Sequence, residues 1–187
     1  MSFFRSRKLA PVTSDFLLEC KDLVRHYGKI KPVDGVSLNL RPHELLSILG
    51  PSGCGKSTLL NLIAGLDEPQ AGEIFIGGEE MSNVHSIVAP ELRRVGMVFQ
   101  DIALFPHLNV FKNVAYGIHG SKDEKRSRVE EMLKLVELSG SEKQMPHELS
   151  GGEQQRIAIA RALAPAPRLL LLDRSEERRV GKECRSR

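Results

Sequence analysis

Residues 50–58 constrain this chain more than any other segment, because they read Gly-Pro-Ser-Gly-Cys-Gly-Lys-Ser-Thr. They fit the pattern G-x-x-x-x-G-K-[ST], with the apolar run Leu45–Leu49 directly before them and the segment Leu59–Ala64 directly after. This order predicts a strand, a glycine-rich loop and a helix, the context in which the pattern holds a phosphate. The sequence therefore predicts a nucleoside triphosphate-binding chain, or a descendant of one. A glycine-rich turn without a ligand is the alternative.

The pattern predicts a role for the polar residues of this loop. Its glycines let the backbone curl so that successive N–H groups point at phosphate oxygens, and the helix N-terminus adds partial positive charge. Lys56 is expected to reach the β- and γ-phosphates of ATP, and the Ser57 hydroxyl to ligate Mg²⁺. The candidate nucleotide-binding residues of the loop are Gly50, Pro51, Ser52, Gly53, Cys54, Gly55, Lys56, Ser57 and Thr58.

A second segment, residues 149–156, reads Leu-Ser-Gly-Gly-Glu-Gln-Gln-Arg. Ser150 and Glu153 predict a capping box before a helix over Gln154–Ala164 that Pro165 stops. Any helix start could carry those two residues. A capping box does not explain the two consecutive glycines at 151 and 152. They expose backbone N–H groups at a helix N-terminus, a place that attracts anions.

Together with the loop, this segment resembles the signature sequence of the ATP-binding cassette (ABC) family. The resemblance covers about residues 16–173 and implies an α/β fold: a P-loop NTPase core with an antiparallel β layer and a helical subdomain, truncated after the Walker B strand. It implies a head-to-tail dimer that sandwiches two ATP molecules. In that dimer the signature residues would close over the γ-phosphate held by the other subunit; they are Ser150, Gly151, Gly152 and Gln154.

Three further positions follow the order of motifs in this family. Tyr27 occupies the place where the family stacks an aromatic ring on adenine, although a lone tyrosine more often fills a core or a turn. Gln100 ends a strand-like segment, Val95–Gln100, and resembles the glutamine that touches Mg²⁺ and the attacking water; a solvated glutamine is the alternative. The expected catalytic residues are Lys56, Gln100 and Asp173, and the expected Mg²⁺ ligands are Ser57, Gln100 and Asp173.

Asp173 follows Leu169–Leu172, a run expected to form a strand buried on both faces. In the family a glutamate comes next as general base, but here the residue is Arg174, which has no lone pair to accept a proton. Glu176 and Glu177 lie too far along the chain to replace it. The switch histidine of the family would follow the end of the sequence. Hydrolysis by this chain is therefore expected to be at background.

The chain divides into three parts. Residues 1–15 form a basic N-terminal segment, and 16–173 form an incomplete ABC nucleotide-binding domain with a helical insert over about 101–164. Residues 174–187 form a highly charged tail that resembles a frameshift or cloning junction; a natural exposed tail and a basic arm are the alternatives. Within the insert, Lys122–Leu138 predicts a helix that buries Val129, Met132, Leu133 and Val136.

Composition argues against several other classes of protein. The net charge is +3, and the tail accounts for it, so nothing indicates nucleic-acid binding. The chain has no run of eighteen apolar residues, and its three cysteines lack the spacing of a disulfide framework or a zinc site.

The segment 96–117 resembles bacterial importers of ferric ion, polyamines, sulfate and sugars, most nearly the ferric-ion and polyamine group. This implies membrane permease subunits and a solute-binding protein as partners, and a peripheral place on the cytoplasmic face of the inner membrane. A soluble ABC ATPase of translation or DNA repair, or a hydrolysis-dead fragment, remains the alternative.

Overall fold

The computed structural model describes residues 14–101 and 103–173; the charged tail and most of the basic N-terminal segment lie outside them. Two short 3₁₀ turns occupy Pro90–Leu92 and Pro146–Glu148. The helices and strands, in chain order, are β1 (Leu18–Tyr27), β2 (Ile30–Leu40), α1 (Lys56–Ala64), β3 (Ala71–Ile76), β4 (Glu79–Ser82), β5 (Val95–Val98), α2 (Val110–Ala115), α3 (Lys122–Leu135), α4 (Gly151–Leu163) and β6 (Leu169–Leu172).

The first four strands form an antiparallel sheet in the order β2-β1-β3-β4, which confirms the antiparallel layer expected from the sequence. A two-residue turn joins β1 to β2, with Tyr27 paired to Ile30 and Gly28 at a φ of 60°. Such a turn needs residues with positive φ, and glycine adopts it without strain. The sheet buries Leu18, Cys20 and Leu23 against a core that it shares with α1.

In the described part of the chain, β5 and β6 pair with each other in parallel, with Val98 opposite Leu172. The expectation that Leu169–Leu172 is buried on both faces is wrong at its last residue, since Leu172 is 47% exposed. The expected strand Leu45–Leu49 is also absent, because no described strand pairs with it. Leu45 and Leu49 are 86% and 78% exposed, and backbone groups without a neighbouring strand form no ladder.

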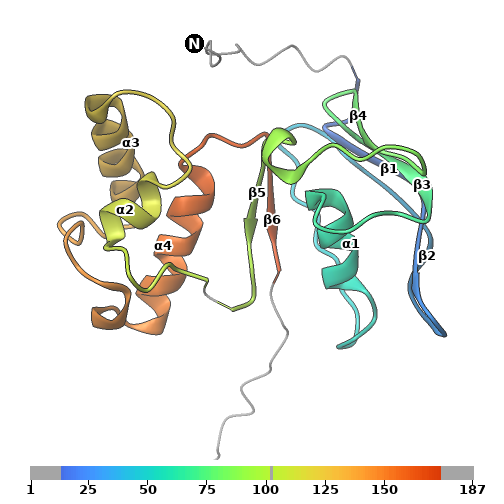
Figure 1. Ribbon diagram of the computed structural model, residues 1–187, viewed down its shortest axis with the longest axis horizontal. Helices are drawn as coiled ribbons and strands as arrows, with labels where there is room; N and C mark the ends of the chain where they lie inside the picture. Colours follow the sequence, from blue (N-terminus) through green and yellow to red (C-terminus); the bar gives the residue numbers. More distant parts are fainter. Residues whose placement is uncertain (1–13, 102, 174–187) are drawn as a thin grey trace, which may run out of the picture.

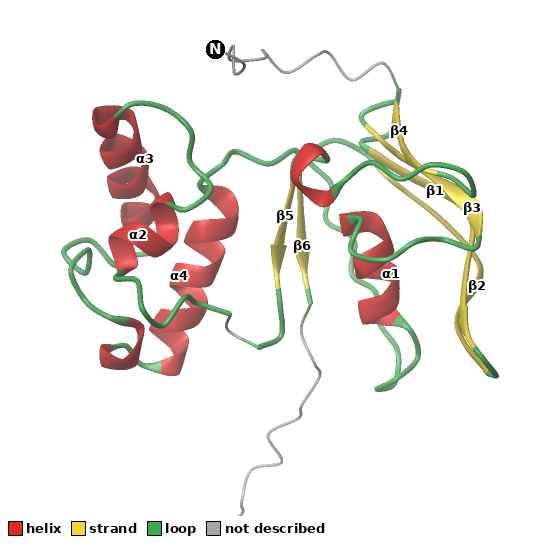
Figure 2. Ribbon diagram, viewed as in Figure 1, coloured by secondary structure: helices red, strands yellow, loops and turns green. Residues whose placement is uncertain are grey.

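Helices α2, α3 and α4 pack into a separate apolar cluster. Val129, Met132, Leu133 and Val136 are buried in it, as the sequence predicts, although α3 ends at Leu135. Figures 1 and 2 show β5 and β6 between the helical cluster on one side and α1 with the four-stranded sheet on the other. None of the described helices has the length and the apolar run that crossing a bilayer requires.

Candidate functional site

The loop before α1 curls tightly against the sheet. Gly53 and Gly55 have φ angles of 80° and 101°, which side-chain-bearing residues rarely adopt. A Cβ on Gly55 would lie 1.9 Å from the carbonyl oxygen of Pro32 in β2. Within the loop, the Cys54 N–H donates to the carbonyl of Pro51 at 3.3 Å. The curl therefore requires glycine at position 55, and it fixes the loop against β2.

The Lys56 side chain folds back over this loop. Its ammonium donates to the carbonyl oxygens of Gly50 and Pro51 at 2.5 and 2.8 Å. Helix α1 begins at Lys56, and its first turn carries no acidic side chain, so the partial positive charge of the helix N-terminus is not neutralised locally. Ser57 is exposed and Thr58 half-buried in the same turn. A cation, a helix N-terminus and a hydroxyl thus converge here, a donor set suited to a phosphate with its Mg²⁺.

Gln100 and Asp173 lie close to the carboxyl ends of the parallel pair β5 and β6. The Asp173 N–H donates to the Val98 carbonyl at 2.9 Å and extends the ladder by one step. Gln100 follows β5 by two residues and is exposed. The arrows of β5 and β6 point toward the end of the molecule where the loop before α1 lies (Figure 1). The carboxyl ends of parallel strands are where α/β proteins place ligands.

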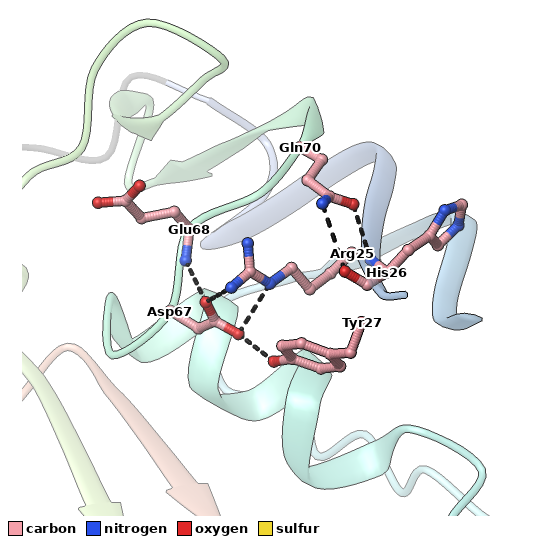
Figure 3. A network of polar contacts seen from close by, with 6 residues as sticks. All are labelled: Arg25, His26, Tyr27, Asp67, Glu68 and Gln70. Atoms are coloured by element: carbon pink, nitrogen blue, oxygen red, sulfur yellow. Dashed lines mark hydrogen bonds and ion pairs between the residues drawn. The ribbon is translucent and has the colours of Figure 1, made fainter. Parts of the chain in front are cut away.

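Tyr27 is the last residue of β1 and is 46% exposed. Its hydroxyl donates to the carboxylate of Asp67, which also forms an ion pair with Arg25 at 2.7 Å (Figure 3). The Arg25 guanidinium lies 4.9 Å from the centre of the tyrosine ring. The tyrosine is therefore not a core residue; its exposed ring flanks the β1–β2 turn and is contacted by Asp67 and Arg25.

The signature segment forms the start of α4, as expected. Ser150 is the N-cap, and its side chain and that of Glu153 form the reciprocal bonds of a capping box. The Glu153 carboxylate accepts from the Ser150 hydroxyl at 2.6 Å and from its N–H at 2.8 Å. The hydroxyl bond first, and then the backbone bond, lower the pKa of Glu153. The predicted start at Gln154 is three residues late, since Gly151 and Gly152 already belong to the helix.

Gly151 and Gly152 are exposed, and a Cβ on either would meet no atom of the described chain within 4 Å. Nothing in this fold therefore requires glycine at these positions. The Gln154 amide instead turns inward and donates to the carbonyls of Pro146 and Leu149 at 2.9 and 3.1 Å. It closes the turn that precedes α4.

The structure does not bring the signature segment to the phosphate loop of the same chain. Helix α4 belongs to the helical cluster and α1 to the sheet cluster. The pair β5–β6 lies between the two helices (Figure 2). The start of α1 and the start of α4 therefore lie in different parts of the described fold.

Sequence reasoning missed three residues that hold Tyr27 and the end of α1 in place: Arg25, Asp67 and Arg93. Arg93 is 1% exposed and donates to the carbonyls of Leu62 and Ile63 at the end of α1, both at 3.0 Å. No sequence pattern indicates a role for any of these three residues. Asp67 lies 40 and 42 residues from its partners in β1, and Arg93 lies 30 and 31 residues from its partners in α1, so only the folded geometry shows these contacts.

The amino-acid sequence is similar to those of several import ATP-binding proteins. The chain is 46% identical over 176 residues to the sulfate/thiosulfate import ATP-binding protein of Neisseria meningitidis. It is 48% identical over 160 residues to the spermidine/putrescine import ATP-binding protein of Chromobacterium violaceum. It is 47% identical over 156 residues to the Fe(3+) ions import ATP-binding protein of Brucella abortus. These alignments cover 89%, 84% and 82% of this chain but only 48%, 43% and 43% of the relatives. The chain thus spans less than half the length of these relatives.

Solved structures share the fold. The CbiO1 protein of Clostridium perfringens, part of an ABC transporter complex, superposes with a TM-score of 0.75 at 31% identity, over 86% of this chain and 66% of that one. An ATP-binding cassette solved as a dimer with ADP and phosphate gives 0.73 at 38% identity, over 83% and 73%. Residues 33–175 match the family described as ABC transporter. With its curled phosphate loop and its capped glycine helix, this chain belongs to the ABC transporter family.

Proposed function

We propose that this chain is the ATP-binding part of the energy-coupling subunit of an importer for a small solute. The observation that carries the proposal is the loop at 50–58, where Gly55 is fitted against Pro32 and the Lys56 ammonium lies over the curl. The two carbonyl oxygens that Lys56 meets are neutral, whereas a β- or γ-phosphate is anionic and forms the stronger, charge-assisted hydrogen bond. ATP would therefore draw the ammonium from the loop carbonyls.

Mg²⁺ would accompany the nucleotide. Ser57 supplies a hydroxyl beside Lys56, and Asp173 and Gln100 supply a carboxylate and an amide at the ends of β6 and β5. Oxygen ligands of this kind suit Mg²⁺, which keeps several waters and neutralises phosphate charge when bound. In this proposal Lys56, Gln100 and Asp173 act at the phosphates, and Tyr27 meets the base.

The active unit would be a head-to-tail dimer. The separation of α4 from α1 and the open space around Gly151 and Gly152 both favour a signature segment that serves another chain. Bare backbone N–H groups at the N-terminus of α4 would then complete the phosphate site of a partner, with Ser150 and Gln154 shaping the turn. A related cassette was solved as a dimer.

The partners would be membrane permease subunits and a solute-binding protein, with this chain peripheral on the cytoplasmic face of the inner membrane. The relatives are named as import proteins for sulfate, polyamines and ferric ion. We infer a solute of the ferric-ion or polyamine group from segment 96–117, which resembles those importers. A soluble ABC ATPase of translation or DNA repair is the competing function.

Neighbouring genes and membrane association test this proposal. We expect permease and solute-binding-protein genes beside this one, and co-expression with the permeases should move the chain from the soluble to the membrane fraction. The solute is then assigned by thermal shift of the neighbouring binding protein with ferric ion, putrescine or sulfate. Two results together would instead support the competing function. The gene would have no permease gene beside it, and the chain would stay in the soluble fraction when it is co-expressed with permeases of the related importers.

A further inference from the structure

The Asp67 carboxylate joins two side chains of β1 that lie 40 and 42 residues earlier in the chain. Its Oδ2 accepts from Arg25 Nε at 3.1 Å and from the Tyr27 hydroxyl, while its Oδ1 lies 2.7 Å from Arg25 Nη2. The Glu68 N–H adds a bond to Oδ1 at 2.8 Å. Figure 3 shows Arg25 and Tyr27 converging on this carboxylate from the same strand. The side chain of Asp67 is 17% exposed, so the pair with Arg25 is partly shielded from solvent.

These contacts fix the Tyr27 ring at two points. The hydroxyl is anchored on Asp67, and the guanidinium of Arg25 lies over the ring at 4.9 Å from its centre. The Tyr27 side chain first, and then the charge of Asp67, raise the pKa of Arg25. An exposed aromatic side chain without such contacts would exchange between rotamers. Here the ring keeps one orientation while 46% of the residue stays accessible.

The backbone around Tyr27 is tied to the same segment. The Gln70 side chain accepts from the His26 N–H at 2.7 Å and donates to the His26 carbonyl at 3.3 Å. The Gln70 N–H donates to the Val24 carbonyl at 2.8 Å. Figure 3 shows this pair of bonds beside the Asp67 contacts. Residues 67–70 therefore hold both the ring and the strand that carries it.

This segment also connects the ring to the phosphate loop. It begins three residues after α1 ends at Ala64, and α1 begins at Lys56. On the other side, Gly55 packs against Pro32 of β2, two residues beyond Ile30, the partner of Tyr27 in the hairpin. Ring and loop are thus linked through α1 and through β2. A ligand that touches both would meet two parts of one rigid unit.

We propose that Asp67 is a positioning residue for nucleotide recognition: it holds the Tyr27 ring in the orientation in which the base stacks on it. The inference rests on the proposed function, and it goes further by assigning base affinity to a carboxylate that does not touch the nucleotide. In this proposal the Tyr27 hydroxyl anchors the ring on Asp67, a hydrogen bond that phenylalanine could not form. Pre-orienting a group before binding lowers the entropy that binding must overcome.

Tyr27→Phe tests this directly, because it keeps the ring and removes only the hydroxyl. Binding to the full chain is measured for ATP and for inorganic tripolyphosphate, which has no base. We expect about a threefold to tenfold weaker affinity for ATP and an unchanged affinity for tripolyphosphate. Asp67→Ala should give the same selective loss, and adding it to Tyr27→Phe should cost little more, since the two act through one contact. Tyr116→Phe, the same change at the other tyrosine, should leave both affinities as in wild type.

A signal from the ring separates positioning from general damage. The chain has two tyrosines, so ring-selective ¹³C labelling gives two sets of signals, and Tyr27→Phe assigns them. In Asp67→Ala the Tyr27 signals should shift and broaden while those of Tyr116 stay in place.

Each other outcome has a distinct meaning. Wild-type affinity for ATP in both Tyr27→Phe and Asp67→Ala, with weaker ATP binding in Tyr27→Ala, would overturn the role of Asp67 and leave the base site intact. Equal losses for ATP and tripolyphosphate would also overturn it, because they indicate a structural role. Wild-type ATP affinity in Tyr27→Ala would instead remove Tyr27 from the proposed site.

Discussion

Arg93 connects more of this fold than any other single side chain described above. Besides the carbonyls at the end of α1, its guanidinium donates to those of Val88 and Met81 at 2.8 and 3.1 Å and to the Ser82 hydroxyl at 3.1 Å. Burial lowers the pKa of the guanidinium. The residue precedes β5, so it ties the phosphate-loop helix to the antiparallel sheet and to the strand that leads to Gln100.

Replacing Arg93 should therefore destabilise the domain strongly. Arg93→Met keeps most of the side-chain volume but removes five hydrogen bonds, four of them buried, and we expect a loss of about 3 kcal/mol or more in the free energy of unfolding. Urea denaturation measures it. Arg126→Met, at a side chain that is 74% exposed, is the matched control and should change stability by less than about 0.5 kcal/mol. Equal effects of the two substitutions would contradict the geometry.

At this scale the sequence predicted residues that act within a short motif and missed those that act across the fold. The curl at Gly53 and Gly55 and the capping box of Ser150 follow from local spacing, and the structure has both. Asp67 and Arg93 give no such signal, because an acidic or basic residue after a helix or before a strand is ordinarily solvated. Their roles depend on which distant backbone groups the fold leaves without partners.

Among the elements, α2 depends on a buried amide. Asn113 is fully buried and donates from Nδ2 to the carbonyls of Phe105 and Leu108 at 3.1 and 2.8 Å, and its Oδ1 accepts from the Phe105 N–H at 2.9 Å. One side chain thus holds the loop between β5 and α2.

Asn113→Ala should release that loop. The Phe105 N–H and the Leu108 carbonyl would lose the Asn113 amide as their partner, which costs about 2 kcal/mol or more, while the Phe105 carbonyl keeps its bond from the Leu108 N–H. We expect faster amide hydrogen exchange at Phe105 than in wild type, together with a lower unfolding midpoint. Asn83→Ala is the matched control, because Asn83 makes its contacts at the exposed end of β4. Unchanged exchange at Phe105 in Asn113→Ala would show that the amide does not hold the loop.

The start of α4 should respond to pH through Glu153. Its pKa in the folded chain is lowered from 4.5 by the bonds from Ser150, so its stabilising effect is present above pH 4.5 and is lost as the pH falls through the folded value. Ser150→Ala removes the hydroxyl bond, and the pKa of Glu153 should rise toward 4.5. A carboxyl ¹³C titration measures this, and Ser127→Ala serves as the control. A Glu153 titration that is identical in wild type and Ser150→Ala would contradict the capping box.

Element prediction succeeded where a segment carries its own signal and failed where it depends on a neighbour. Helix α3 has a capping box at Ser121 and an apolar face, and both ends lie within three residues of the expected ones. The run Leu45–Leu49 has the composition of a buried strand, but a strand exists only through its partner, and none of the described strands pairs with it. Composition alone could not reveal that.

For the molecule as a whole, the proposed site separates nucleotide binding from turnover. The phosphate loop, Gln100 and Asp173 are in the described structure, whereas Arg174 lies outside it. An arginine next to Asp173 cannot take a proton from water, so we expect this chain to hydrolyse ATP no faster than Lys56→Ala does. A phosphate-release assay at saturating ATP and Mg²⁺ measures both proteins. Turnover clearly above that of Lys56→Ala would refute the expectation and require another general base.

In the proposed function, residues 50–58 bind ATP through Lys56. Binding of a fluorescent ATP analogue to the full chain tests it, with Lys56→Ala beside Lys134→Ala, a control that removes an exposed lysine from the last turn of α3. Circular dichroism establishes that the three proteins are equally folded. We expect saturable, Mg²⁺-dependent binding in wild type and Lys134→Ala, and none in Lys56→Ala. Equal affinity in all three folded proteins would contradict it.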